Sequence, residues 1–153
     1  MPKLDSSKVV AQVQSLAGTK AGRTEILSAA AHAMREAGPP YTSVYFYMLE
    51  PSREHLVLEA HSGRNTPHTR IAVGVGVCGT AVATGTDQNV GDVRAVSNYL
   101  ACNVYTRSEL VVLIRKDGEI VGQVDIDSDE PDPFTIEEAA AVRAVADEIG
   151  RVL

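Results

Sequence analysis

The stretch Ser108–Ser128, with the sequence SELVVLIRKDGEIVGQVDIDS, decides the fold. Its first part, Ser108–Arg115, is strongly apolar and rich in Val, Leu and Ile, as expected of a buried strand. Lys116–Glu119 contains the dipeptide Asp-Gly, which is typical of a tight hairpin turn. Ile120–Asp127 then returns as a second strand. The stretch therefore predicts an antiparallel hairpin.

Further strands and helices are predicted on both sides of this hairpin. Tyr41–Glu50 is rich in Tyr, Val and Phe, and His55–His61 is its hairpin partner, with Leu56, Leu58 and Ala60 on one face. Consecutive hairpins make the sheet antiparallel, with the N- and C-terminal helices packed on one face, so the fold class is α+β. The remaining predictions are helices over Lys8–Leu16, Thr24–Ala37, Ala81–Thr84 and from Thr135 to about Arg151, and a strand over Thr69–Val73.

Capping patterns and one irregular segment complete the description of the chain. Thr24 is the predicted N-cap of its helix, and Thr135 with Glu138 three residues later predicts a capping box. Asp87–Thr106 has weak periodicity and predicts a long irregular connection. Such connections in compact domains are usually functional lids or disordered segments.

Composition excludes several classes of function. The 153 residues fit one domain with no internal repeat or linker, and the formal net charge of -6 argues against a nucleic-acid partner. No stretch has the length and apolarity of a membrane span. Met1–Val10 lacks the apolar run of a signal peptide, so a cytoplasmic location is expected.

Two cysteines are the first candidates for chemistry. Cys102 lies in a polar loop, where it is either a small packing residue or a nucleophile whose thiol should ionise below the ordinary pKa of about 8.5. Cys78 lies in a glycine-rich turn before a short helix, and a helix N-terminus lowers the pKa of a thiol. As a pair they suggest a second role for Cys78, because a sulfenic acid condenses with a nearby thiol.

Three carboxylates are the second candidate. Asp125 and Asp127 alternate with Ile126 at the end of an apolar strand, so both point to the same face. Glu109 starts the neighbouring strand and should lie roughly opposite Asp125 or Asp127. Carboxylates this close repel one another, so one pKa is raised and that group can hold a proton for donation. The alternative is an ordinary solvated strand end.

No cofactor or metal site is expected. Gly74, Gly76 and Gly79 match Gly-x-Gly-x-x-Gly, but no full helix of a parallel βαβ unit and no Lys-Ser or Lys-Thr follows, so the run predicts a tight turn. No Cys-x-x-Cys or His-x-x-x-His spacing predicts a metal centre. The four histidines, predicted to be surface residues, are His32, His55, His61 and His68.

Four blocks of sequence carry a family resemblance. They are Gly-Val-Cys-Gly-Thr-Ala at 76–81, Leu-Ala-Cys at 100–102, Ser-Glu-Leu-Val-Val at 108–112 and Val-Asp-Ile-Asp-Ser at 124–128. They resemble the free methionine-R-sulfoxide reductases, which are single GAF domains. The resemblance implies one GAF domain over residues 1–153, with N-terminal helices in 1–37 and the core in 41–153.

The resemblance also implies a reaction. Cys102 would attack the sulfur of free L-methionine-R-sulfoxide, release methionine and become a sulfenic acid. Glu109, Asp125 and Asp127 would line the pocket, give a proton to the sulfoxide oxygen and suit the ammonium group of a free amino acid. Cys78 would then form a disulfide with Cys102, which thioredoxin would reduce.

Three positions depart from the family pattern. His68 stands where the family commonly has a third cysteine, so Cys78 would resolve the sulfenic acid alone. Asn103 replaces the Asp that usually follows the nucleophile. Ser43 stands where a pocket Trp is expected, although Tyr47 matches the pocket Tyr that follows it.

Two other functions stay open at the level of sequence. One is a GAF sensor that binds a small molecule without turnover. The other is a dimerisation module, because the N-terminal helices could pair two subunits, and a homodimer is accordingly possible.

Overall fold

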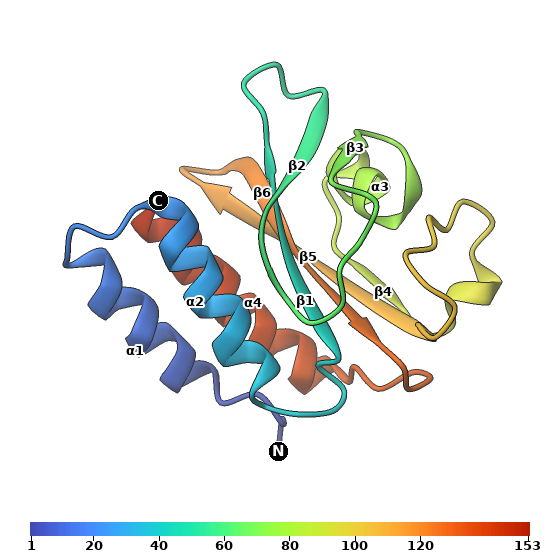
Figure 1. Ribbon diagram of the computed structural model, residues 1–153, viewed down its shortest axis with the longest axis horizontal. Coiled ribbons are helices and arrows are strands. Elements are labelled where there is room, and N and C mark those ends of the chain that lie inside the picture. Colours follow the sequence, from blue (N-terminus) through green and yellow to red (C-terminus); the bar gives the residue numbers. More distant parts are fainter.

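A six-stranded antiparallel sheet forms the centre of the molecule. The computed structural model describes all 153 residues and orders the strands β3-β2-β1-β6-β5-β4 (Figure 1). The predicted α+β class and antiparallel sheet are therefore confirmed. The strands are β1 (Ser43–Leu49), β2 (His55–Ser62), β3 (Arg70–Ala72), β4 (Gln88–Val90), β5 (Ser108–Lys116) and β6 (Glu119–Ser128). The helices are α1 (Ser6–Ala17), α2 (Arg23–Arg35), α3 (Gly76–Thr84), α4 (Ile136–Val152) and the 3-10 helix η1 (Val93–Ala95).

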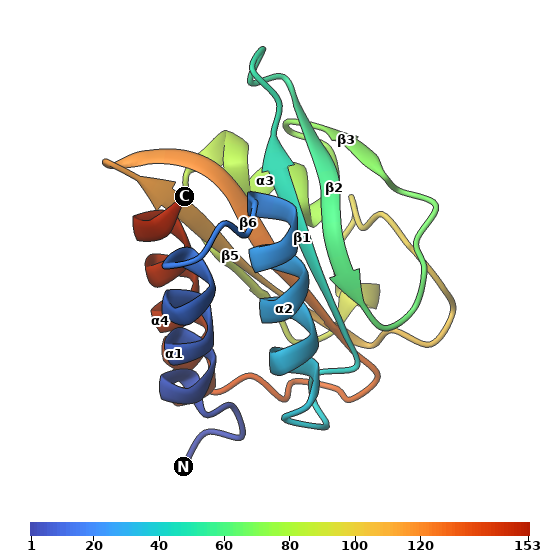
Figure 2. The same ribbon diagram turned by 60° about the vertical axis from the view of Figure 1, so that its left-hand side comes forward.

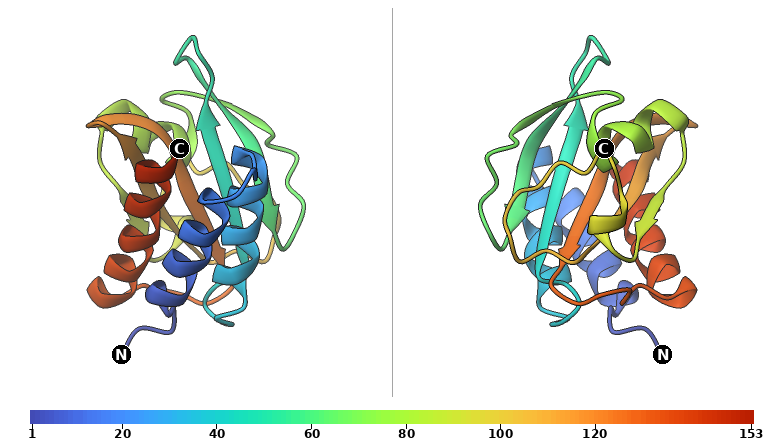
Figure 3. Two further views of the ribbon diagram at one scale, coloured as in Figure 1. Left: turned by 90° about the vertical axis from the view of Figure 1, so that its left-hand side faces the viewer. Right: turned by 90° about the vertical axis from the view of Figure 1, so that its right-hand side faces the viewer.

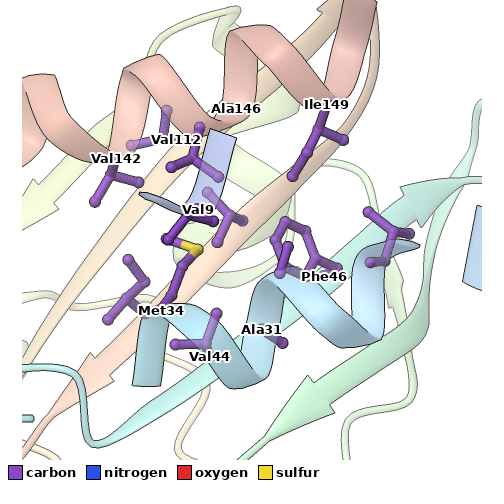
Figure 4. Close-up of a cluster of buried hydrophobic side chains, with 14 of the residues drawn as sticks. Val9, Ala31, Met34, Val44, Phe46, Val112, Val142, Ala146 and Ile149 are labelled. Carbon is purple, nitrogen blue, oxygen red and sulfur yellow. The ribbon is translucent and has the colours of Figure 1, made fainter. Parts of the chain in front are cut away.

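The helices divide between the two faces of the sheet. Helices α1, α2 and α4 pack side by side on one face, as predicted for the terminal helices (Figures 1 and 2). Helix α3 lies on the other face (Figure 3). Alternate strand residues fill the layer between the sheet and the three helices, because side chains along a strand point to opposite faces. The buried residues labelled there in Figure 4 are Val9, Ala31, Met34, Val44, Phe46, Val112, Val142, Ala146 and Ile149.

The β5–β6 hairpin forms as its sequence predicted. Asp117 and Gly118 both have positive φ, 52° and 82°, which is the backbone that an Asp-Gly hairpin turn requires. The register places Glu109 directly opposite Asp127. Side chains of directly opposed residues share a face, so this register brings two carboxylates together.

Strand β2 contains an irregularity that the sequence pattern did not indicate. Its pairing with β1 shifts by one residue at Glu59, between Leu58 and Ala60. An extra residue reverses the alternation beyond it. Ala60 therefore packs in the helix-side core, whereas Leu56 packs on the other face. The prediction that Ala60 shares a face with Leu56 and Leu58 was wrong.

The helix starts agree with the capping patterns in part. Gly22 is the N-cap of α2, so Thr24 lies inside the first turn, and its predicted capping role was wrong. Thr135 does cap α4, because its hydroxyl accepts a hydrogen bond from Glu138 N at 3.1 Å. The Glu138 carboxylate does not complete the capping box and binds other backbone groups instead.

The segment predicted as irregular contains two short elements, β4 and η1. The loop after η1 carries Cys102 and crosses the face of the sheet opposite the three helices (Figure 3, right). Strand β4 extends the sheet at the β5 edge. None of the helices combines the length and apolarity needed to span a membrane.

Candidate active site

Three carboxylates lie buried on the face of the sheet that turns away from α1, α2 and α4. Val124 and Ile126 of β6 fill the helix-side core, so the alternating Asp125 and Asp127 point to the opposite face. Glu109 of β5 shares that face through its pairing with Asp127. The exposed fraction is 6% for Glu109 and 3% for each aspartate. These are not the solvated side chains of an ordinary strand end.

The carboxylates form hydrogen bonds with one another and with Cys78. The Cys78 thiol donates to Glu109 Oε2 over 3.8 Å, and Asp125 shares a hydrogen bond with Glu109. Burial raises the pKa of all three carboxyls, and the charge of Asp125 raises the pKa of Glu109 and Asp127 further. Arg64 opposes this effect in part at Asp127. The cluster therefore retains protons at a pH where exposed carboxyls have lost them.

The same cluster is the place where side chains come close enough to hold a metal ion. The ligand atoms of Cys78, Glu109 and Asp125 all lie within 4.8 Å of one another. Sequence spacing did not indicate this group, because its members come from three separate segments. Shared hydrogen bonds account for their approach, so the geometry is that of a proton-holding cluster.

Cys102 is half-buried beside these acids. Its Sγ accepts a hydrogen bond from Thr66 Oγ1 at 3.1 Å. Burial raises the pKa of the Cys102 thiol to about 11, helped by the charges of Asp127 and Asp125 and opposed by the Thr66 hydrogen bond. The expectation of an acidic thiol was wrong for this structure. The charges that act on Sγ belong to carboxylates, and carboxylates disfavour a thiolate.

Cys78 is also less acidic than the sequence suggested. Helix α3 begins at Gly76 rather than Ala81, so Cys78 lies within the first helical turn and is buried. Burial raises the pKa of the Cys78 thiol well above its ordinary value, and Asp125 and Glu109 raise it further. The predicted lowering by the helix N-terminus was wrong, because desolvation and two carboxylates outweigh it.

Both cysteines line one small cavity. Its volume is about 10 Å³, roughly the space of a single water molecule. A small-molecule ligand needs far more room, so residues that line this cavity would have to move apart for a ligand to fit in it. The lining residues are Tyr47, His68, Ile71, Val75, Gly76, Val77, Cys78, Leu100, Cys102, Glu109 and Asp125.

Comparisons with known proteins identify the family. Residues 23–153 match the GAF domain. A free methionine-R-sulfoxide reductase of Escherichia coli (strain K12) is 37% identical over 108 residues, covering 71% of this chain and 64% of that protein. The type II free methionine-R-sulfoxide reductase from Thermoplasma acidophilum is 35% identical over 94% of both chains, with a TM-score of 0.79. The chain belongs to the GAF domain family and, within it, to the free methionine-R-sulfoxide reductases.

The predicted family and the GAF fold are thus confirmed. The free methionine-R-sulfoxide reductase of Neisseria meningitidis, whose structure holds its substrate, is 31% identical over 96% of this chain and 87% of that chain, with a TM-score of 0.86. The chain spans about half to two thirds of the length of the curated relatives it matches.

Ser43 shows how this GAF domain differs at the position expected to hold a pocket Trp. Ser43 is 1% exposed and its Oγ accepts a hydrogen bond from Arg64 N at 3.0 Å. A Cβ on Gly63, whose φ is +116°, would lie 2.5 Å from that oxygen. The β2–β3 loop therefore lies directly on Ser43 and leaves no space for a larger side chain.

Tyr47 and His68 connect the sheet to the Cys102 loop. The Tyr47 hydroxyl donates to the His68 carbonyl oxygen at 2.7 Å, and His68 Nε2 hydrogen-bonds to the Ala101 carbonyl oxygen at 2.8 Å. His68 is a half-exposed residue that also lines the cavity, a contact that its prediction as a surface residue did not indicate. Asn103 forms a local turn, because its Oδ1 accepts from Tyr105 N at 2.7 Å.

Among the residues of the site that were not predicted from the sequence are Thr66, Tyr99 and Leu100. Thr66 bonds to Cys102, and Leu100 lines the cavity. The Tyr99 hydroxyl is buried without a hydrogen-bond partner. All three lie on irregular segments, where no periodicity indicates which side chains turn inward.

Proposed function

We propose that this GAF domain reduces free L-methionine-R-sulfoxide to methionine, with Cys102 as the nucleophile. The supporting observation is that one buried cavity is lined by two free thiols, Cys78 and Cys102, and by carboxyls that retain protons. A pure binding pocket needs no second thiol and no acid cluster beside the first thiol.

The first half of the reaction oxidises Cys102. The thiol gives its proton to an ionised carboxylate of the cluster, and the thiolate sulfur attacks the sulfoxide sulfur. This attack forms a bond between the Cys102 sulfur and the substrate sulfur, while a carboxyl among Glu109, Asp125 and Asp127 gives a proton to the sulfoxide oxygen. The resulting hydroxyl passes to the Cys102 sulfur as the sulfur–sulfur bond breaks, and the electron pair of that bond stays with the substrate sulfur. The net change is one thiol and one sulfoxide converted to one sulfenic acid and one thioether, with Cys102 oxidised and the substrate reduced.

The substrate supplies the charge that the empty site lacks. The carboxylates raise the pKa of Cys102, and a free amino acid brings an ammonium group that neutralises part of their field. Binding of the substrate would therefore favour the thiolate at the moment when it is needed. The same carboxylates would select a free amino acid over a methionine sulfoxide inside a peptide, which has no ammonium group at this position.

The second half of the reaction regenerates the thiols. The Cys78 sulfur attacks the sulfenic acid of Cys102, which forms a disulfide and releases water. A dithiol protein such as thioredoxin would reduce that disulfide. The reaction starts from reduced Cys102 and needs a reductant, so the proposal places it in a reducing compartment such as the cytoplasm. The homodimer stays a prediction. Val9 and Val13 of α1 are buried in the protein's own core, so these two side chains are not available to pair two subunits.

Turnover of the two sulfoxide epimers tests the proposal. The purified protein is incubated with free L-methionine-R-sulfoxide or its S epimer and dithiothreitol, and methionine release is measured. We expect turnover of the R epimer alone, its loss in Cys102→Ser, and its retention in Cys78→Ser, because dithiothreitol can reduce the sulfenic acid directly. Thioredoxin in place of dithiothreitol should fail with Cys78→Ser. A folded, reduced protein that binds the sulfoxide without turnover would instead be a sensor.

A further inference from the structure

A single hydrogen bond reaches the sulfur of Cys102. It comes from Thr66, which lies in the β2–β3 loop (residues 63–69), and the Oγ1–Sγ distance is 3.1 Å. The other groups that act on this thiol are acids, which disfavour its ionisation. Thr66 is thus the one neighbour whose contact favours a negative charge on the sulfur.

The Thr66 hydroxyl oxygen also takes part in a second hydrogen bond. His68 N donates to Thr66 Oγ1 at 3.1 Å. A hydroxyl has one proton, and its oxygen here accepts from the backbone, so the proton is free to point at Cys102 Sγ.

Two further contacts hold the β2–β3 loop against the Cys102 loop. Tyr47 of β1 fixes the His68 carbonyl oxygen at 2.7 Å, and the His68 ring binds the Ala101 carbonyl oxygen at 2.8 Å. The residue before the nucleophile is therefore tied to the same loop that presents Thr66. Donor and sulfur are positioned by one connected set of bonds that begins on the rigid sheet.

We propose that Thr66 is a catalytic residue whose hydroxyl stabilises the Cys102 thiolate during attack on the sulfoxide. This inference rests on the proposed function for its chemistry. The hydroxyl keeps its own proton throughout and donates only a hydrogen bond. The Cys102 proton passes to the carboxyl cluster, as in the reaction above, so the overall balance is unchanged.

Several titratable side chains surround the Cys102 sulfur. They come from every element packed against the sulfur: Tyr45 and Tyr47 of β1, Glu109 of β5, Asp125 and Asp127 of β6, Tyr99 of the same loop and His68 of the β2–β3 loop. A substitution at Thr66 changes none of these side chains, although Thr66→Val also removes the oxygen that accepts the hydrogen bond from His68 N, which Thr66→Ser retains.

Alkylation of Cys102 tests the role of Thr66 without any sulfoxide. In a Cys78→Ser background, the rate of iodoacetamide addition at pH 8 is compared for Thr66, Thr66→Val and Thr66→Ser by intact mass. Loss of one hydrogen bond to a charged group should raise the apparent pKa by about one and lower the thiolate fraction about tenfold. The less acidic thiolate is more nucleophilic, so the rate should fall about threefold. Thr66→Ser should restore it.

A matched control separates the hydroxyl from the loop. Thr69→Val makes the same change on the same loop at an exposed residue whose side chain forms no hydrogen bond, and it should leave the alkylation rate unchanged. Thr66→Ala repeats the test without β-branching, and circular dichroism checks that each variant is folded. Unchanged alkylation in Thr66→Val, equal slowing in Thr69→Val, or no rescue by Thr66→Ser would each overturn the proposal. In turnover, we expect kcat to fall and KM to stay constant.

Discussion

At the scale of the residue, the raised pKa of Asp127 has opposite consequences for the proposed proton transfer and for the stability of the fold. The side chain is 3% exposed, and one of its oxygens has no hydrogen-bond partner. Burial and the neighbouring Asp125 raise its pKa, which in the proposed reaction would keep a proton available for the sulfoxide oxygen. The same environment makes an ionised Asp127 unfavourable in the folded protein, so this carboxyl reduces stability at alkaline pH.

Removal of an acid should affect turnover more than a surface substitution. Glu109→Gln keeps the size of the side chain but removes the carboxyl, and we expect kcat/KM to fall about 10²- to 10³-fold if Glu109 transfers the proton. Glu119→Gln, at the exposed turn of the same hairpin, is the control and should be neutral. Wild-type turnover by both variants would assign proton transfer to the aspartates.

The pH dependence of turnover follows from the raised pKa values. A proton donor is active below its pKa, so kcat/KM should fall as pH rises through the raised pKa of the carboxyl cluster. That fall should occur well above the ordinary carboxyl value of about 4. Measurement of kcat/KM from acid to alkaline pH checks this, and a fall centred near the ordinary value would contradict the proton-donor role.

Asp127→Asn should stabilise the protein at alkaline pH. The folded carboxyl has a raised pKa, so its contribution to stability is present below the unfolded pKa and is lost as pH rises through the folded pKa. Neutral Asn avoids that loss, and we expect a gain of about 1 kcal/mol or more in the free energy of unfolding at pH 8, shrinking toward pH 4.

Asp129→Asn is the matched control for that measurement. Arg64 lowers the pKa of Asp129 through a hydrogen-bonded ion pair at 2.6 Å, so its stabilising contribution is present at alkaline pH and is lost in acid. The control should therefore show no gain at pH 8 in urea denaturation. A gain in both variants would point to a general charge effect instead of a buried acid.

At the scale of the element, Glu138 joins the N-terminal segment to helix α4. Its carboxylate accepts hydrogen bonds from Lys3 N at 2.6 Å, Leu4 N at 3.1 Å and the Tyr41 hydroxyl at 2.7 Å. The side chain is buried, and the three donors belong to segments far apart in the sequence. This role explains why Glu138 does not fold back onto its own helix cap.

Truncation of Glu138 should destabilise the whole protein. Glu138→Ala leaves three donors without their partner, two of them backbone groups, and we expect a loss of about 2–4 kcal/mol in the free energy of unfolding. Glu137→Ala, the exposed neighbour in the same helical turn, should change stability by no more than about 0.5 kcal/mol. Denaturant unfolding of both variants decides between a structural contact and a simple helix effect.

At the scale of the whole molecule, the two faces of the sheet carry layers of different kinds. Helices α1, α2 and α4 cover one face with a continuous apolar core. The other face carries α3 and the Cys102 loop around a cavity of about 10 Å³. If the proposed substrate binds in this cavity, the residues that line it must move apart, while the helix layer on the other face can stay in place.

Hydrogen exchange should detect this division. Without substrate, amides of the Cys102 loop (residues 96–107) should exchange faster than those of α4, because that loop has few backbone hydrogen bonds. Free methionine-R-sulfoxide added to the Cys102→Ser variant should slow exchange in this loop and in the β2–β3 loop. Protection confined to the helix layer would place the ligand site elsewhere.

The sequence by itself determined the parts of the site that depend on chain neighbours. The Asp-Gly turn and the apolar alternation of Ser108–Ser128 were enough to predict the hairpin and to place Asp125 and Asp127 on one face near Glu109. The two cysteine blocks indicated the family, which the comparisons confirmed. Each of these features depends on residues that lie near one another in the sequence.

Only the tertiary structure decided the properties that depend on distant segments. The directions of the pKa shifts at Cys78 and Cys102, opposite to those expected, follow from burial beside acids of β5 and β6. The inward position of His68 and the contact of Thr66 with Cys102 come from loops that fold over the sheet. The ionisation state of a side chain depends on how far water is excluded from it and on the charges that the fold brings close to it. Neither can be inferred from the spacing of residues along the chain.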